Sequence, residues 1–246
     1  MGSVIAMLSG KGGTGKTTAC AGISIALANA GERVLCVDCD VGLRNLDISL
    51  GLAESNALSF QDVAEGGYSL EQAAVHPDFP NLCFLTAPMN RRVDQIDEEA
   101  FRCMIRTARN QFDYVLLDAP AGVEGGFHLA ATPADRCIVV TGAGPAAVRD
   151  AARVGQLLEL AGKADVRLLV NRVDKVMLSL LDQTIDDVMD TAGLPLIGVV
   201  LEDPDVPMAA ATGKSLLRYN KRSVTAKTFQ RIAKRIQGYP EPIKIR

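Results

Sequence analysis

Aromatic residues and histidine are scarce in this sequence. The 246 residues include no tryptophan and two histidines, and aromatic residues make up 4% of the total. His76 and His128 have no evident ligand partners near them in the sequence, which predicts ordinary structural roles for both. No stretch approaches the roughly 18 consecutive apolar residues of a membrane-spanning helix. No basic segment precedes the first apolar run, so the sequence predicts a core strand there and no signal peptide.

Cysteines are present but dispersed. The six of them are scattered through predicted strands and helices in a chain without an export signal. This distribution predicts reduced, buried thiols and a cytoplasmic protein. The chain is 48% hydrophobic and contains 22 glycines, which suits an α/β protein with a sizeable core. No linker, internal repeat or low-complexity tract is evident, and this predicts a single domain over residues 1–246.

Charge is unevenly distributed along the chain. Residues 214–246 contain ten basic residues and one acidic residue, so they carry a net charge of +9. Because the whole chain has a net charge of −3, residues 1–213 carry −12. A basic segment of this kind predicts either an anionic partner surface or a solvated face.

The dominant motif is a glycine-rich loop near the amino terminus. Residues 10–17 match the P-loop pattern G-x-x-x-x-G-K-[ST], between a predicted strand at 4–8 and a predicted helix at 17–30. In this context free backbone N–H groups and the positive end of the helix dipole face the same point, which suits phosphate. Lys16 is placed to reach the β- and γ-phosphates, and the Thr17 hydroxyl to bind Mg²⁺. The motif therefore predicts a nucleoside-triphosphate site.

Strands and helices alternate along the rest of the chain. The predicted strands are continuous apolar runs, at residues 33–38, 82–85, 114–118, 137–141, 166–170 and 196–201. The main predicted helices lie at residues 97–111, 145–161, 180–192 and 223–237. Continuous apolar strands predict a mostly parallel, doubly wound sheet buried under helices on both faces, which is the fold of P-loop NTPases.

Polar residues follow several of these strands. Asp38 and Asp40 come at the end of the second strand, Asp118 ends the 114–118 strand in a Walker B pattern, and Asn171 follows the 166–170 strand. In doubly wound sheets, ligands bind at the carboxyl ends of the strands. We therefore expect these residues to converge on the P-loop, with Asp118 supporting Mg²⁺ through its water shell or directly.

Four segments together resemble the MinD/ParA family of deviant Walker A ATPases. They are K-G-G-T-G-K-T-T at residues 11–18, D-C-D-V-G-L-R-N-L-D at 38–47, D-A-P-A-G-V-E at 118–124 and V-R-D at 148–150. The stretch at 40–47 is most similar to the MinD members. The resemblance implies a Mg²⁺-dependent ATPase that forms a homodimer with ATP and acts as a switch. In that family such switches control spatial positioning in bacterial cell division, together with regulatory division proteins.

The resemblance also implies roles for individual residues. Lys11 would act across the dimer on the partner's nucleotide, Lys16 would neutralise phosphate charge and Asp40 would orient the attacking water. The implied nucleotide-binding residues are Gly12, Gly13, Thr14, Gly15, Lys16, Thr17, Thr18, Asn171, Pro204 and Asp205, the last three around the adenine. The implied metal-binding residues are Thr17 and Asp118, and the implied switch or partner-binding residues are Arg44, Asn45, Asp47 and Asp150.

Two other functions stay open at this point. A ParA-like partition ATPase would use the basic segment 214–246 on DNA. A nucleotide-binding scaffold would hydrolyse little ATP. Ala119, where a hydroxyl or thiol residue is usual in the family, and the altered loop at 141–145 leave room for the scaffold.

The last predicted helix bears on membrane binding. Phe229, Ile232, Ala233 and Ile236 form one apolar stripe, which favours a core helix with a solvated basic face over an interfacial membrane helix. The basic residues of segment 214–246 predict a weak, salt-sensitive attraction to the anionic inner face of the cell membrane, without insertion. DNA is the less favoured partner.

Overall fold

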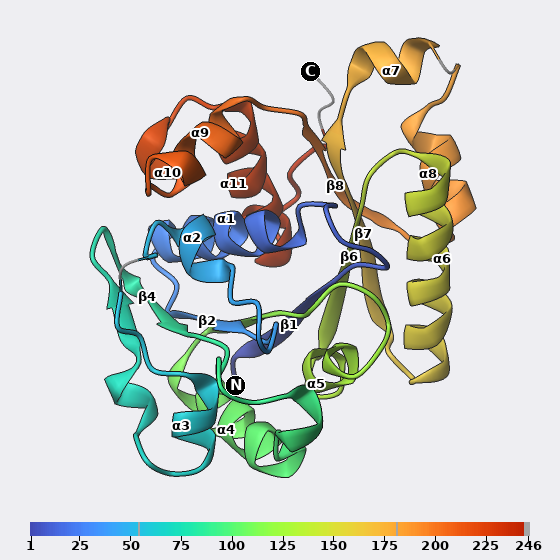
Figure 1. Ribbon diagram of the computed structural model, residues 1–246. Helices are drawn as coiled ribbons and strands as arrows, with labels where there is room; N and C mark the ends of the chain where they lie inside the picture. Colours follow the sequence, from blue (N-terminus) through green and yellow to red (C-terminus); the bar gives the residue numbers. More distant parts are fainter. Residues whose placement is uncertain (54, 181, 244–246) are drawn as a thin grey trace.

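An eight-stranded sheet forms the centre of the fold (Figure 1). The computed structural model describes residues 1–53, 55–180 and 182–243. The strands are β1 (Ser3–Leu8), β2 (Val34–Asp38), β3 (Ala74–His76), β4 (Phe79–Leu85), β5 (Tyr114–Asp118), β6 (Arg136–Thr141), β7 (Asp165–Val173) and β8 (Leu196–Leu201). Their order is β3-β4-β2-β5-β1-β6-β7-β8; β3 is antiparallel to β4, and the other pairs are parallel. The mostly parallel, doubly wound sheet predicted from the sequence is confirmed.

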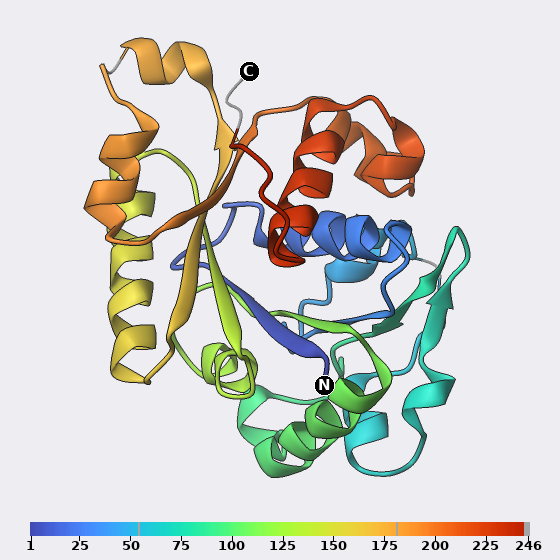
Figure 2. The ribbon, with the colours of Figure 1, turned by 180° about the vertical axis from the view of Figure 1, so that it is seen from behind.

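Helices cover both faces of this sheet (Figures 1 and 2). One face carries α1 (Lys16–Asn29), α2 (Leu46–Leu50), α9 (Asp205–Ala211), α10 (Leu216–Tyr219) and α11 (Val224–Ile236). The other carries α3 (Phe60–Ala64), α4 (Glu98–Gln111), α5 (Gly126–Ala131), α6 (Pro145–Leu160) and α8 (Ile185–Ala192). The short helix α7 (Lys175–Leu180) projects beyond the end of β7, and two 3₁₀ turns lie at Leu70–Gln72 and Val93–Gln95.

The central strand β1 shows why the apolar runs are continuous. Val4, Ala6 and Leu8 contribute to the core under α4, α5 and α6, whereas Ile5 and Met7 contribute to the core under α1 and α11. All five side chains are fully buried. Because successive residues of a strand point to opposite faces, a strand covered on both sides must be apolar at every position.

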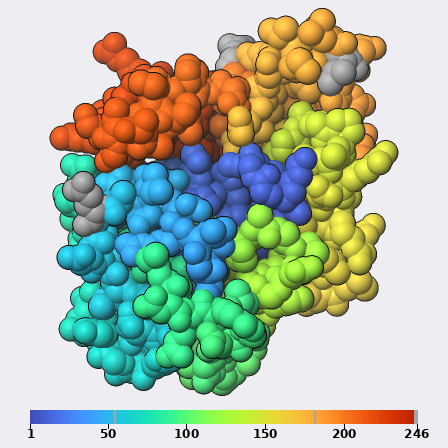
Figure 3. Space-filling model, viewed as in Figure 1, coloured from blue at the N-terminus to red at the C-terminus, as the bar shows by residue number. Residues whose placement is uncertain are grey.

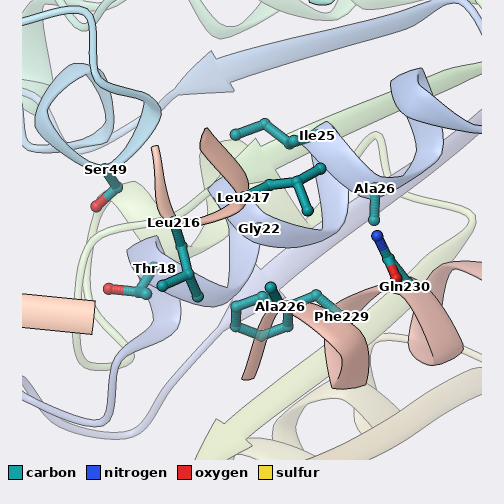
Figure 4. A pocket seen from close by; sticks show the side chains of 10 residues that line it. All are labelled: Thr18, Gly22, Ile25, Ala26, Ser49, Leu216, Leu217, Ala226, Phe229 and Gln230. Atoms are coloured by element: carbon teal, nitrogen blue, oxygen red, sulfur yellow. The ribbon is translucent and has the colours of Figure 1, made fainter. Parts of the chain in front are cut away.

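The helix α11 belongs to the core, as its apolar stripe predicts. The Ser223 hydroxyl caps it by accepting a hydrogen bond from the amide of Ala226. Phe229 and Ile232 are buried against α1 and the sheet, and the Phe229 ring lies where a Cβ on Gly22 of α1 would be (Figure 4). The apolar face of α11 is therefore occupied by the protein itself. No helix in the described part of the chain is long and apolar enough to cross a bilayer.

Two expectations from the sequence are wrong. The helix expected at 180–192 is replaced by α7, which ends at Leu180, and α8, which begins at Ile185. Thr184 starts α8 through a capping box, since its hydroxyl accepts from the Asp187 amide at 3.1 Å while its own amide donates to the Asp187 carboxylate at 2.7 Å. The thiols are also not all buried, because Cys83 is half-buried and Cys103 is exposed on α4.

Candidate nucleotide site

The P-loop joins β1 to α1 at the carboxyl end of the central strand. Gly13 and Gly15 both have φ of +80°, a left-handed conformation that glycine adopts without strain. Gly10 lies so close to α6 that a Cβ there would come within 2.5 Å of the Asp150 Cβ. Helix α1 begins at Lys16 directly after the loop, so the N-terminal amides of the helix face the same region as the loop. This arrangement is an anion site.

Lys16 is held in a buried ion pair with Asp118. Lys16 Nζ lies 2.6 Å from Asp118 Oδ1, and the side chains are 6% and 1% exposed. Lys16 Nζ also donates to Thr17 Oγ1 at 3.3 Å. Burial alone would lower the pKa of Lys16, but the Asp118 carboxylate raises it above its ordinary value. The P-loop lysine and the Walker B acid therefore converge as expected, and they form an ion pair with each other.

Asp38 acts as a buried cap rather than facing the P-loop lysine. Its Oδ1 accepts from the amide of Asp40 at 2.9 Å, and its Oδ2 accepts from the amides of Asn45 and Leu46 at 3.1 Å each. Leu46 is the first residue of α2. The Asp38 carboxylate therefore holds the 40–45 loop closed and accepts a hydrogen bond from a helix N–H that has no partner within the helix. Burial, followed by the negative charge of Asp118, raises the pKa of Asp38 to about 6.

Asp40 and the loop after it lie beside this cap. Asp40 is half-buried; burial raises its pKa above the ordinary value, and the charge of Lys16 opposes that shift. Arg44 has φ of +45°, and its Nε donates to the Asp47 carboxylate at 2.8 Å. Asn45 is exposed and contributes its backbone amide to Asp38. The predicted switch residues thus form one hydrogen-bonded loop whose anchor is Asp38.

Asn171 lies against the P-loop itself. Its Nδ2 donates to the carbonyl oxygens of Thr14 at 2.8 Å and Gly15 at 3.4 Å. It also lines a pocket of about 310 Å³ between the P-loop and the β8–α9 segment. Pro204 and Asp205, also expected near the adenine, stand at the start of α9, where the Asp205 carboxylate accepts from Asn220 at 2.7 Å. Their neighbours Asp203, Val206 and Pro207 line the pocket.

The remaining predicted residues lie at the rim. Lys11, Gly12 and Gly13 are exposed at the tip of the P-loop. Asp150 is half-buried on α6, next to Gly10. In Figure 3 the blue amino-terminal segment reaches the surface at the centre of the molecule, between the orange carboxyl-terminal region and the yellow-green segments. The loop tip is therefore open to an approaching ligand or partner.

Arg172 and Glu202 belong to this site although the sequence analysis missed them. Arg172 Nη1 donates to the Gly13 carbonyl at 3.1 Å, and its Nε pairs with Glu202 at 3.0 Å. Both side chains line the pocket beside Asn171. The only signal in the sequence is that Arg172 follows Asn171, and that position alone assigns no direction to its side chain.

The fold and the site together define a P-loop nucleotide-binding protein of the deviant Walker A class. A family model described as the CobQ/CobB/MinD/ParA nucleotide binding domain matches residues 5–217. The septum site-determining protein MinD of Synechocystis sp. is 38% identical, with 98% of this chain and 92% of the relative covered. That of Thermotoga maritima is also 38% identical, with coverages of 99% and 91%.

Solved structures agree with the sequence comparisons. A structure of the MinC:MinD cell division complex of Aquifex aeolicus matches with a TM-score of 0.90, 34% identity and 98% of both chains covered. MinD of Pyrococcus horikoshii, solved with Mg-ADP, matches with a TM-score of 0.85, 31% identity and 96% of both chains covered. The chain belongs to the CobQ/CobB/MinD/ParA family, and within it to the MinD-like ATPases.

Proposed function

We propose that this protein is a MinD-like switch ATPase whose ATP-bound form is a homodimer, built as a single domain over residues 1–246, and that it acts in bacterial division-site placement. The observation that carries the proposal is the convergence of Lys16, Thr17 and Asp118 beneath an exposed Lys11, with Asp40 at the edge. The structure with Mg-ADP and the MinC:MinD complex are those of relatives. They support nucleotide binding and a division-protein partner here.

The oxygen atoms around Lys16 suit Mg²⁺. Thr17 Oγ1 and Asp118 Oδ1 already converge on one cation, the Lys16 ammonium, at 3.3 and 2.6 Å. A hydroxyl and a carboxylate are ligands that Mg²⁺ accepts beside phosphate oxygens and water. Thr17 and Asp118 would therefore hold the ion, which supplies charge neutralisation at the phosphates when bound. Thr14 Oγ1, which is buried without a hydrogen-bond partner among the described residues, is a further polar atom for a ligand.

Different residues of the chain then have different roles in phosphoryl transfer. Lys16 leaves Asp118 to neutralise phosphate charge, and Asp40 orients the attacking water. Lys11 of one protomer reaches the nucleotide of the other, so hydrolysis requires dimerisation. Positioning and charge neutralisation supply most of the catalysis in such sites, and no histidine is needed. ATP contacts at the loop tip then favour one arrangement of the 40–47 loop, and hydrolysis releases it.

Partners would bind next to this machinery. Asp150 packs on Gly10 of the P-loop. A division protein that contacts Asp150 would therefore be separated from the P-loop by this one side chain. The membrane contact is electrostatic, because the apolar face of α11 is buried while Lys227 and Lys234 are exposed. Each basic residue near an anionic leaflet contributes about 1 kcal/mol, and salt screens that attraction. The protein would thus be cytoplasmic and peripheral at the inner face of the membrane.

The test is ATP turnover by the purified protein, measured alone, with anionic liposomes and with DNA. The Lys11→Ala variant should bind ATP but lose turnover, whereas Lys16→Ala should lose nucleotide binding. Stimulation by anionic liposomes that disappears near ~0.5 M salt supports the membrane contact, since the Debye length there is only a few ångströms. Stimulation by DNA would instead favour a partition-type ATPase.

Arg102→Ala is the matched control for Lys11. It removes one positive charge on α4, where the 37% exposed Arg102 side chain pairs with Glu99. This variant should keep wild-type turnover. If Lys11→Ala hydrolyses ATP like the wild type, the action of Lys11 across the dimer is wrong. If the wild type binds ATP without turnover, the protein is a scaffold.

A further inference from the structure

β7 is irregular at the point where it reaches the P-loop. Against β8, Val170 pairs with Val199 but Val173 pairs with Leu201, so β7 has one extra residue between these pairs. This is a β-bulge, a feature that re-aims side chains. Arg172, inside it, has φ of +55°. Consecutive residues of a regular strand point to opposite faces, yet here Asn171 and Arg172 both contact the P-loop.

The two side chains bind three successive carbonyl groups of the loop. Arg172 Nη1 donates to Gly13 O at 3.1 Å, and Asn171 Nδ2 donates to Thr14 O at 2.8 Å and to Gly15 O at 3.4 Å. The contact with Asn171 requires glycine at position 15, because a Cβ there would overlap Asn171 Nδ2. The guanidinium group is itself held from the other side, where its Nε and Nη2 donate to the two carboxylate oxygens of Glu202 at 3.0 and 3.2 Å.

These contacts fix the direction of the loop amides. In a planar trans peptide unit the C=O of one residue and the N–H of the next point in opposite directions. Holding the carbonyls of residues 13, 14 and 15 toward β7 therefore turns the N–H groups of residues 14, 15 and 16 away from it. Amides that are aimed before the ligand arrives bind it without the cost of ordering the loop.

We infer that Arg172 is a positioning residue for the polyphosphate: locked to Glu202, it sets the P-loop amides through the Gly13 carbonyl and does not act by contacting the base. The inference rests on the proposed nucleotide site and adds a residue to it. A left-handed conformation is unfavourable for arginine, and such strain is retained where it serves a function. Arg172→Gly therefore separates the backbone strain from the side-chain contact, since glycine adopts this left-handed conformation without strain but cannot donate to the Gly13 carbonyl.

The experiment compares ADP with inorganic tripolyphosphate, which has no base or ribose, at one fixed excess of Mg²⁺. Arg172→Gly should weaken the binding of both by the same factor, about three- to tenfold, as expected for a partly exposed charge-assisted hydrogen bond. Its melting temperature should stay near the wild-type value. Arg172→Lys can donate to the Gly13 carbonyl but cannot make the two-bonded contact with Glu202. Its affinity for each ligand should lie between those of the wild type and Arg172→Gly. Arg167→Ala, which removes an exposed arginine at the opposite end of β7, is the control and should bind both ligands normally.

The outcomes distinguish the inference from the proposed function. If Arg172→Gly weakens ADP binding but leaves tripolyphosphate binding unchanged, Arg172 acts on the base or ribose, and the inference is overturned. Unchanged binding of both ligands overturns it as well. If the wild type binds neither ligand, it is the nucleotide site that fails. Should the glycine variant not fold, the lysine variant and Glu202→Gln decide the question by the same comparison of the two ligands.

Discussion

Removing the charge of Lys16 should destabilise the nucleotide-free protein as well as abolish nucleotide binding. Lys16 and Asp118 are 6% and 1% exposed and 2.6 Å apart, and Asp38 and Asp40 add negative charge nearby. Lys16→Met keeps the length of the side chain but leaves Asp118 as a buried, uncompensated carboxylate. Breaking a buried pair in this way costs about 3–5 kcal/mol. The loss should shrink as the pH falls, because burial raises the pKa of Asp118 and protonation of this carboxylate removes the unpaired charge.

Urea unfolding without nucleotide measures this loss, and the double variant Lys16→Met/Asp118→Asn identifies its origin. With both charges removed, no ion is left unpaired, so the double variant should be more stable than Lys16→Met alone. Arg33→Met is the control, because its pair with Asp113 is 60% and 37% exposed, and a solvent-screened surface pair contributes much less to stability than a buried one. The reasoning would be refuted if the stability loss of the double variant equalled the sum of the losses of its two single variants. A loss in Lys16→Met as small as that of Arg33→Met would refute it as well.

Two further predictions concern Asp38 and the packing of α11. Asp38 has its pKa raised from 3.8 to about 6, so the folded state holds the proton more tightly and stability falls as the pH rises through that window, by about 3 kcal/mol in all. Urea titrations at several pH values should show a shallower fall in Asp38→Asn; equal slopes would count against the shift. Gly22→Ala should lower the melting temperature, because a Cβ there overlaps the Phe229 ring and overpacking costs about 1–3 kcal/mol. Phe229→Leu should partly rescue it, and a stabilised Gly22→Ala would contradict the packing.

The fold was predictable because its signals are local and repeated. Each central strand is an apolar run covered on both faces, and the long helices α4, α6 and α11 each carry an apolar stripe, as Phe229 and Ile232 do in α11. β3 escaped prediction because three residues give no periodicity, and its buried His76 is held by a bond from a distant segment, with Nε2 2.9 Å from the Leu50 carbonyl. The break before α8 did have a local signal, since T-x-x-D at residues 184–187 matches a capping box.

At the site, some residue positions follow from sequence motifs, and others follow only from the alignment of strands in the sheet. The motif places Lys16 at the start of a helix and Asp118 at the end of a strand, and parallel packing of β1 beside β5 brings them together, with Met7 paired to Asp118. Their direct ion pair at 2.6 Å depends on the directions of the two side chains, which spacing does not encode. The position of Arg172 depends on one extra residue in β7 relative to β8, a register between strands about thirty residues apart. The residues of the P-loop motif can thus be identified from the sequence, whereas Arg172 can be placed only when β7 and β8 are aligned.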